Sequence, residues 1–286
     1  MSITPDETFL TASDGHRFPL LSRIPDDARM ALLWLPALGV AARHYLPFAD
    51  ALAARGVAVF VHEWRGNGGS SLRAGRGHDW GYRELLERDL PLGDQTVQRH
   101  LPHVPCAIGG HSLGGQLAAC YLGLHPHAFA RLWLVASGSP HWRAFPGLRG
   151  LSLPWFYRFA IWLSHRRGFL PGRRLGFGGN EARSLIEDWA RVGLSGRYAA
   201  AGMTVDPEAG MATVDAAIDA VLLRRDWLAP PASLRALLAK LPRADARVLT
   251  LDADALGAPA DHFAWMRHPD AVADALLRPT LAAGDQ

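Results

Sequence analysis

The chain has 286 residues, of which 49% are hydrophobic and 20% are charged, and its mean hydropathy is +0.01. This composition is typical of a globular protein and excludes a disordered chain or a short-repeat fibre. Thirty basic residues against 27 acidic ones leave a formal net charge of +3, which gives no reason to expect a nucleic-acid partner.

The first half of the chain alternates short apolar runs with amphipathic stretches. Two strands, at 7–10 and 18–23, flank Asp14-Gly15, a dipeptide typical of hairpin turns, and are expected at one edge of a sheet. The runs that follow predict, in chain order, a strand at 31–35, a helix at about 43–54, a strand at 57–61, a helix at about 82–99 broken or kinked at Pro91, a strand at 106–108, a helix at about 113–124 and a strand at 132–136. Such alternation is typical of a parallel sheet with helices on both faces.

This alternation stops after Ser137. Residues 140–213 are rich in Trp, Phe, Gly and Arg, and they predict helices and loops inserted as a cap. The remaining runs predict a strand at 217–223, a helix at about 232–241, a strand at 248–251 and a helix at about 270–277. We therefore expect a core built from residues 1–139 and 214–286, with the cap between its two parts.

The cysteine content and the first residues of the sequence indicate the cellular compartment in which the protein is expected. Cys106 and Cys120 are too few for a disulfide framework, and no Cys/His cluster has the spacing of a zinc site. The first residues lack the basic and apolar regions of a secretion signal. The uncharged stretch 106–125 is interrupted by His, Ser, Gln and several Gly, so stable membrane insertion is not expected. These features predict a cytoplasmic protein without a bound metal.

The clearest chemical signal is the run Gly110-His111-Ser112-Leu113-Gly114, a G-x-S-x-G pattern between a predicted strand and a predicted helix. A nucleophilic serine there occupies a sharp turn with a strained backbone, and the positions two residues away need glycine because a side chain would clash. The helix that follows directs its free N–H groups toward a developing oxyanion. We interpret Ser112 as a nucleophile, with Gly110 and Gly114 as the glycines of the elbow.

A serine nucleophile needs a base that is oriented by an acid, and this type of elbow is followed by the acid and then by the histidine. Asp226 follows the strand at 217–223, and His262 lies in the loop after the last predicted strand, so both are expected on the side of the sheet where Ser112 lies. The alternatives are the acids Asp252, Asp254 and Asp261 and the base His268. Asp226 is favoured as the acid because Asp252 and Asp254 lie at the end of the strand that leads into the loop of His262 itself. His111 is interpreted as a packing or hydrogen-bonding residue.

The oxyanion needs a second backbone donor from the loop after an earlier strand. The segment 35–39, Leu-Pro-Ala-Leu-Gly, occupies this place, so the backbone N–H groups of Leu38 and Leu113 are the expected pair. Neither contact depends on a side chain, and leucine is therefore acceptable at both positions.

With these residues in place, the sequence resembles the α/β-hydrolase superfamily over essentially the whole chain outside the cap. The run Glu63-Trp64-Arg65-Gly66-Asn67-Gly68-Gly69-Ser70 is similar to the family's D-x-R-G-x-G-x-S loop, and residues 226–230 resemble its acid loop. Among its members the chain is similar to bacterial short-cap hydrolases related to monoacylglycerol lipases and serine aminopeptidases. The resemblance implies a mostly parallel eight-stranded sheet, a Ser112/Asp226/His262 triad and no cofactor. The chain differs at Pro36-Ala37, Glu63 and Asp261, where the family has His-Gly, Asp and Gly.

The reaction that this resemblance implies is hydrolysis of a carboxylic ester through an acyl-enzyme, with a small-molecule ester or acyl substrate. Between His141 and Ala200 ten Arg stand against three acids (Glu181, Glu187 and Asp188), a balance that argues against a peptide amino terminus as substrate. An acyltransferase or thioesterase, a cofactor-free haloperoxidase or lyase, and a noncatalytic binding protein remain open.

The cap has two interpretations. Its Arg and Trp residues could bind an anionic substrate or an acidic lipid surface, or its arginines could be solvated while its aromatics pack the cap onto the sheet. The sequence favours packing, and it leaves the oligomeric state open.

Overall fold

The structure is a computed structural model that describes residues 3–278. Its centre is one eight-stranded sheet with the strand order β1-β2-β4-β3-β5-β6-β9-β10. These strands are β1 (Ile3–Thr11), β2 (Arg17–Pro25), β3 (Met30–Leu35), β4 (Val57–His62), β5 (Cys106–His111), β6 (Arg131–Val135), β9 (Ala217–Leu223) and β10 (Ala246–Leu251). At one edge β2 runs antiparallel to both of its neighbours, β1 and β4, and the six strands from β4 to β10 in this order are parallel to one another. The expected eight-stranded, mostly parallel sheet is confirmed.

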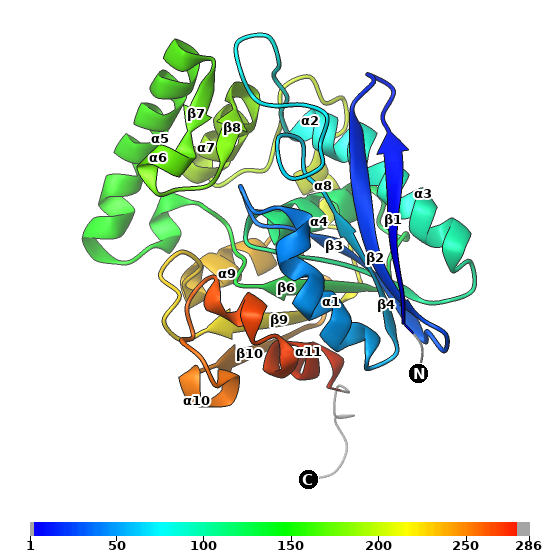
Figure 1. Ribbon diagram of the computed structural model, residues 1–286. Coiled ribbons are helices and arrows are strands. Elements are labelled where there is room, and N and C mark those ends of the chain that lie inside the picture. Colours follow the sequence, from blue (N-terminus) through cyan, green and yellow to red (C-terminus); the bar gives the residue numbers. More distant parts are fainter. Residues whose placement is uncertain (1–2, 279–286) are drawn as a thin grey trace.

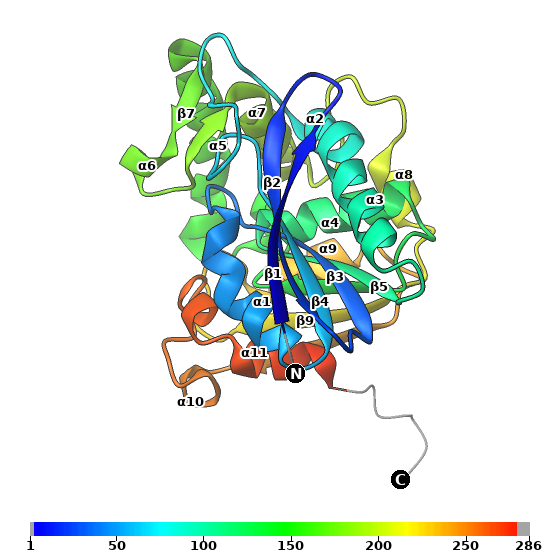
Figure 2. The same ribbon diagram turned by 45° about the vertical axis from the view of Figure 1, so that its right-hand side comes forward.

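Helices cover both faces of the sheet (Figures 1 and 2). The first apolar core lies between one face of the sheet and the helices α3 (Leu90–His100), α4 (Leu113–Leu124) and α9 (Pro231–Leu238). The second core lies on the opposite face, against α1 (Leu46–Ala53) and α11 (Asp270–Leu277). Strand β3 shows why its run is uninterrupted by polar residues, since Leu33 faces the first core and Leu32 and Trp34 face the second.

Two predicted elements differ in detail from the structure. The stretch expected to form one helix from about 82 to 99 is a short helix α2 (Tyr82–Glu84), a π-helical turn over Leu85–Asp89 and then α3, with Pro91 in its first turn. Pro91 has no N–H to donate, and the π-helical turn shortly before it is where the regular hydrogen-bond pattern of the helix is interrupted. Strand β5 extends to His111, further than the expected 106–108, so it leads directly to Ser112. The helix expected at 113–124 has those bounds as α4.

The segment between β6 and β9 lies outside the main sheet and forms the cap; residues 147–195 gather on one side of the molecule in Figure 1, whereas residues 207–211 pack against α4. Its elements are the helices α5 (Gly147–Arg167), α6 (Gly172–Leu175), α7 (Arg183–Ser195) and α8 (Pro207–Met211) and the antiparallel hairpin of β7 (Phe169–Pro171) and β8 (Asn180–Ala182). The hairpin was not expected from the sequence. The division into a core and a cap at residues 140 and 213 stays a prediction. A four-residue helix α10 (Ala253–Leu256) follows β10.

Candidate active site

Ser112 lies in the tight turn between β5 and α4. Its backbone dihedrals are φ 54° and ψ −119°, and Ser112 and Ala136 are the two non-glycine residues with positive φ in the described part of the chain. Such a conformation is costly for a residue with a side chain and persists only where the surroundings enforce it. The turn leaves Ser112 partly exposed at the amino end of a twelve-residue helix. The strained geometry expected for a nucleophile elbow is therefore present at this serine.

The two flanking glycines permit this turn. A Cβ on Gly110 would lie 2.3 Å from the carbonyl carbon of Gly114, and a Cβ on Gly114 would lie 2.0 Å from the carbonyl oxygen of Leu35. Both distances are far below van der Waals contact. Helix α4 thus approaches the end of β3 closely, and glycine is required at both positions.

The second pair of candidate residues meets from two different loops. Nδ1 of His262 lies 2.7 Å from Oδ2 of Asp226, within hydrogen-bond distance, and both residues are buried. The other oxygen of Asp226 accepts the backbone N–H groups of Leu228 and Ala229, at 2.8 and 3.1 Å. The carboxylate is therefore fixed by its own loop, and its remaining oxygen orients the imidazole.

The three candidate residues follow the carboxyl ends of the parallel strands β5, β9 and β10, so they share one edge of the sheet. The ring of His262 lies 4.7 Å, centre to centre, from the ring of His111, the residue directly before Ser112. Within residues 3–278, no hydrogen bond joins the Ser112 hydroxyl to His262. Catalytic hydrogen bonds of this kind often tighten only when substrate binds.

The alternative acids have other partners. Asp252 accepts the backbone N–H of Ala255 at the start of α10, and Asp261 accepts those of Phe263 and Ala264. Asp254 is exposed on α10, and His268 is exposed at the end of a short 3-10 helix. Asp226 is the acid that contacts His262, as the sequence order predicts.

The segment 35–39 is held from two sides. Nε1 of Trp64 donates to the carbonyl oxygen of Pro36 at 2.8 Å, and a Cβ on Gly39, which has φ 74°, would lie 2.0 Å from the backbone nitrogen of Gly179 in the cap. Leu38 and Leu113 line one small cavity together. The two expected N–H donors therefore belong to segments that the fold brings together.

A third contact to the same segment comes from a residue that sequence reasoning missed. The buried hydroxyl of Tyr45 accepts the backbone N–H of Ala37 at 2.9 Å and lies 2.8 Å from Nδ1 of His111. Burial holds the pKa of His111 well below its usual range, so its ring is neutral. His111 is thus a packing and hydrogen-bonding residue, as expected, and nothing in the local sequence indicated Tyr45.

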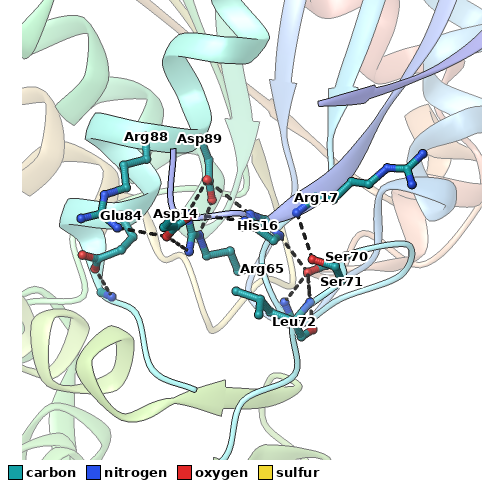
Figure 3. A network of polar contacts seen from close by, with 12 residues as sticks. Asp14, His16, Arg17, Arg65, Ser70, Ser71, Leu72, Glu84, Arg88 and Asp89 are labelled. Atoms are coloured by element: carbon teal, nitrogen blue, oxygen red, sulfur yellow. Dashed lines mark hydrogen bonds and ion pairs between the residues drawn. The ribbon is translucent and has the colours of Figure 1, made fainter. Parts of the chain in front are cut away.

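The loop of residues 63–70 is a structural support. Glu63 is buried and accepts the backbone N–H groups of Ala42 and Gly69, at 3.1 and 3.4 Å. Arg65 binds both carboxylate oxygens of Asp89, at 2.6 and 2.7 Å, and its third nitrogen binds Asp14 at 2.7 Å (Figure 3). These contacts anchor the loop to the hairpin of β1 and β2 and to the π-helical turn.

Two hollows adjoin the candidate site. The larger one, of about 770 Å³, is lined by His262 and Phe263, by Trp227 from the acid loop and by Gly176 from the cap. The smaller cavity, beside Leu38 and Leu113, is also lined by Glu181 of the cap. Glu181 is buried, its hydrogen bond in the described structure comes from the Gly179 backbone N–H at 2.7 Å, and burial raises its pKa to about 7. The base and the donor segment thus face different hollows.

The sheet topology, the elbow and the buried histidine–carboxylate pair define an α/β-hydrolase. The sequence profile described as "Serine aminopeptidase, S33" matches residues 26–253, and the chain belongs to that family. No curated protein matches the chain in sequence.

Solved structures with the same fold include a hydrolase from Pseudomonas aeruginosa PA01, 20% identical, with a TM-score of 0.62 over 95% of this chain and 97% of that one. The N-formylmaleamic acid deformylase Nfo from Pseudomonas putida S16 is 16% identical, with a TM-score of 0.61 over 96% and 100% of the two chains. Est1E from Butyrivibrio proteoclasticus, solved with ferulic acid, is 16% identical, with a TM-score of 0.59 over 94% and 96%. At these identities the likeness concerns the fold. Among residues 3–278, no helix combines the length and apolarity needed to cross a bilayer.

Proposed function

We propose that this chain is a serine hydrolase that cleaves a small carboxylic ester. Ser112 is the nucleophile, His262 the general base, Asp226 the acid that orients it, and the backbone N–H groups of Leu38 and Leu113 bind the oxyanion. The observation that carries the proposal is the buried hydrogen bond between His262 and Asp226, 2.7 Å long, beside the strained turn at Ser112.

The reaction follows from these roles. The hydroxyl oxygen of Ser112 attacks the ester carbonyl while Nε2 of His262 takes its proton, and the negative charge on the carbonyl oxygen is bound by the two N–H groups. The imidazolium then protonates the leaving alcohol as the C–O bond breaks, which leaves an acyl-enzyme. Water, deprotonated by His262, attacks the acyl group and restores the Ser112 hydroxyl.

The test is a panel of p-nitrophenyl esters with short to long acyl chains, with the wild type and Ser112→Ala measured in parallel. Hydrolysis should disappear in Ser112→Ala and persist in Ser195→Ala, which removes an exposed hydroxyl from the end of α7. A fluorophosphonate probe should label the wild type and fail on Ser112→Ala. Failure to label folded wild-type protein would support a noncatalytic binding protein instead.

A second substrate class is favoured by one observation. Of the three acids in residues 141–200, Glu187 pairs with His165 and Asp188 with Arg191, whereas Glu181 has no ion-pair partner among residues 3–278 and lines the cavity beside the donor segment. A buried carboxylate there could bind the ammonium group of an amino-acid substrate, as the family's description suggests. Amino-acid p-nitroanilides in the same panel separate this class from neutral esters.

Acyltransferase and thioesterase activities use the same residues, so the geometry does not separate them from ester hydrolysis. Thioesters in the panel, and competition between water and added alcohols or amines for the acyl group, distinguish the three reactions. The cytoplasmic location predicted from the sequence belongs to the same proposal, and cell fractionation checks it.

A further inference from the structure

The outer side of helix α5 carries a continuous apolar stripe. Its members recur three or four residues apart, which places them on one face of the helix. They are Leu148 (84% exposed), Leu151 (62%), Trp155 (75%), Phe159 (46%) and Trp162 (57%). Large apolar side chains that are exposed singly are ordinary, but a row of five on one helix indicates an interaction surface. We call these five residues the α5 stripe.

The opposite face of the same helix packs against the cap. Its buried residues are Gly150, Tyr157, Ala160 and Ser164, and the ring of Tyr157 makes an edge-to-face contact with Trp189 of α7. Helix α5 lies at the outer side of the cap, away from the main sheet (Figure 1). Tyr157 and Trp189 thus pack against each other inside the cap, whereas the α5 stripe points outward.

The charge of helix α5 indicates which kind of partner the α5 stripe would bind. Helix α5 contains four arginines, Arg149, Arg158, Arg166 and Arg167, and no acidic residue. A helix with tryptophans on an exposed face and arginines beside them has the composition of helices that lie in the interface of anionic membranes. An acid-free helix is also poorly suited to pairing with a second copy of itself, because the two sets of arginines would repel each other.

Helix α5 contacts the candidate site through Arg149, which is next to Leu148 of the α5 stripe. The guanidinium of Arg149 lies 5.2 Å from the ring centre of Trp227, and Trp227 is 57% exposed and lines the hollow that contains His262. Phe263, which is 44% exposed, lines the same hollow. A partner on the α5 stripe would therefore lie beside Arg149, whose guanidinium contacts the wall of that hollow.

We propose that the α5 stripe binds the surface of an anionic phospholipid membrane. The apolar side chains enter the acyl boundary and the arginines of α5 contact the lipid phosphates, with no segment crossing the bilayer. This inference does not rest on the proposed function, because it concerns binding alone, and Ser112→Ala should bind as the wild type does.

The test is co-sedimentation with phosphatidylcholine vesicles and with mixed phosphatidylcholine–phosphatidylglycerol vesicles. The wild type should bind the mixed vesicles more strongly, and added salt should weaken binding. Trp155→Ser with Trp162→Ser should lower the partition coefficient about tenfold or more. Arg158→Gln should lower it about fivefold on mixed vesicles only.

Matched controls lie elsewhere on the surface. Phe9→Ser removes an aromatic with the same 46% exposure as Phe159 from the edge strand β1, and Arg243→Gln removes an exposed arginine outside the cap. Both should bind as the wild type does. Absence of wild-type binding, equal binding to the two vesicle types, or unchanged binding of the double Trp variant would each overturn the proposal. So would a wild-type dimer that the double Trp variant converts to a monomer, because the α5 stripe would then be an interface between copies.

Discussion

The hydroxyl of Tyr45 lies 2.8 Å from Nδ1 of His111, the residue directly before Ser112. The same hydroxyl accepts the backbone N–H of Ala37, one residue before Leu38. The ring of His111 is neutral and its Nδ1 lies within hydrogen-bond distance of this hydroxyl, so one buried oxygen joins the elbow to the donor segment. The relative position of the proposed nucleophile and the proposed oxyanion donor is set in part by this contact.

Replacing this tyrosine tests that role. Tyr45→Phe should lower kcat for a p-nitrophenyl ester by about tenfold with little change in KM, because a displaced donor stabilises the transition state less well. Tyr121→Phe is the matched control, since that buried hydroxyl donates to Asp94 away from the site. Equal losses of kcat in the two variants would show that Tyr45 acts through general stability.

Substitution of Asp226 and of Asp254 distinguishes the two candidates for the acid that orients His262. Asp226→Asn should lower kcat by about 10³–10⁴-fold, because an amide favours the wrong tautomer of His262. Asp254→Asn should leave kcat close to the wild-type value, since Asp254 is exposed on α10. The reverse pattern in steady-state kinetics would show that Asp254 is the acid.

The close approach of α4 to the end of β3 can be tested by measuring the free energy of unfolding of a variant at Gly114. Gly114→Ala should lower the free energy of unfolding by about 2 kcal/mol or more, because its Cβ would lie 2.0 Å from the Leu35 carbonyl oxygen. Gly77→Ala is the control, since its Cβ would meet nothing within 4 Å. Chemical denaturation measures both, and a Gly114→Ala variant as stable as Gly77→Ala would contradict the close packing of α4 on β3.

The carboxyl of Glu181 should make the stability of the protein depend on pH near neutrality. Burial raises its pKa from 4.5 to about 7, so the folded state favours the protonated form. The contribution of this carboxyl to the free energy of unfolding is complete below the unfolded-state pKa of 4.5. It is lost as pH rises from there to about 7, and the loss is at most about 3 kcal/mol.

Glu181→Gln should therefore be more stable than the wild type at pH 8 and similar to it below pH 4.5, as thermal unfolding would show. The control is Glu187→Gln, which changes a carboxylate that is paired with His165 and partly exposed. A wild type as stable as Glu181→Gln at pH 8 would mean that the carboxyl is hydrated or paired in solution.

The carboxyl of Asp14 should make the stability of the protein depend on pH in the opposite sense, so that stability is lost as pH falls into the acid range. Partial burial raises the pKa of Asp14, but hydrogen bonds from Arg65 and from the His16 backbone outweigh it and hold the pKa below its usual range. Its contribution to stability is present above the unfolded-state pKa, near 3.8, and is lost as pH falls below that value. Asp14→Asn should flatten the decline of stability in acid, whereas Asp26→Asn, at an exposed position, should not.

Local patterns were sufficient to predict the sheet and to predict that the three candidate residues lie at one edge of it. Helix α4 has its predicted bounds, because a glycine-rich turn precedes it and an apolar stretch continues to Leu124. The order of Ser112, Asp226 and His262 was sufficient to place them at one edge, since parallel strands end on the same side.

Contacts between distant segments were not predictable in this way. Tyr45 reaches His111 across 66 residues, and Arg65 reaches Asp14 across 51 residues. The π-helical turn before Pro91 carries Asp89, which binds Arg65, but the local pattern there is an ordinary helical one. The exposure of the α5 stripe was also hidden, because apolar residues occur on both faces of that helix.

The close approach of Gly39 and Gly179 makes the cap a support for the segment that carries the proposed oxyanion donor, Leu38. A chimera that keeps the strands and core helices but exchanges residues 140–213 for a foreign insert would lose the surface against which the donor segment rests. Such an exchange would change the rate constant of the chemical step together with the choice of substrate. If Leu38 donates as proposed, a replacement of the cap in this chain needs compensating changes around Leu38.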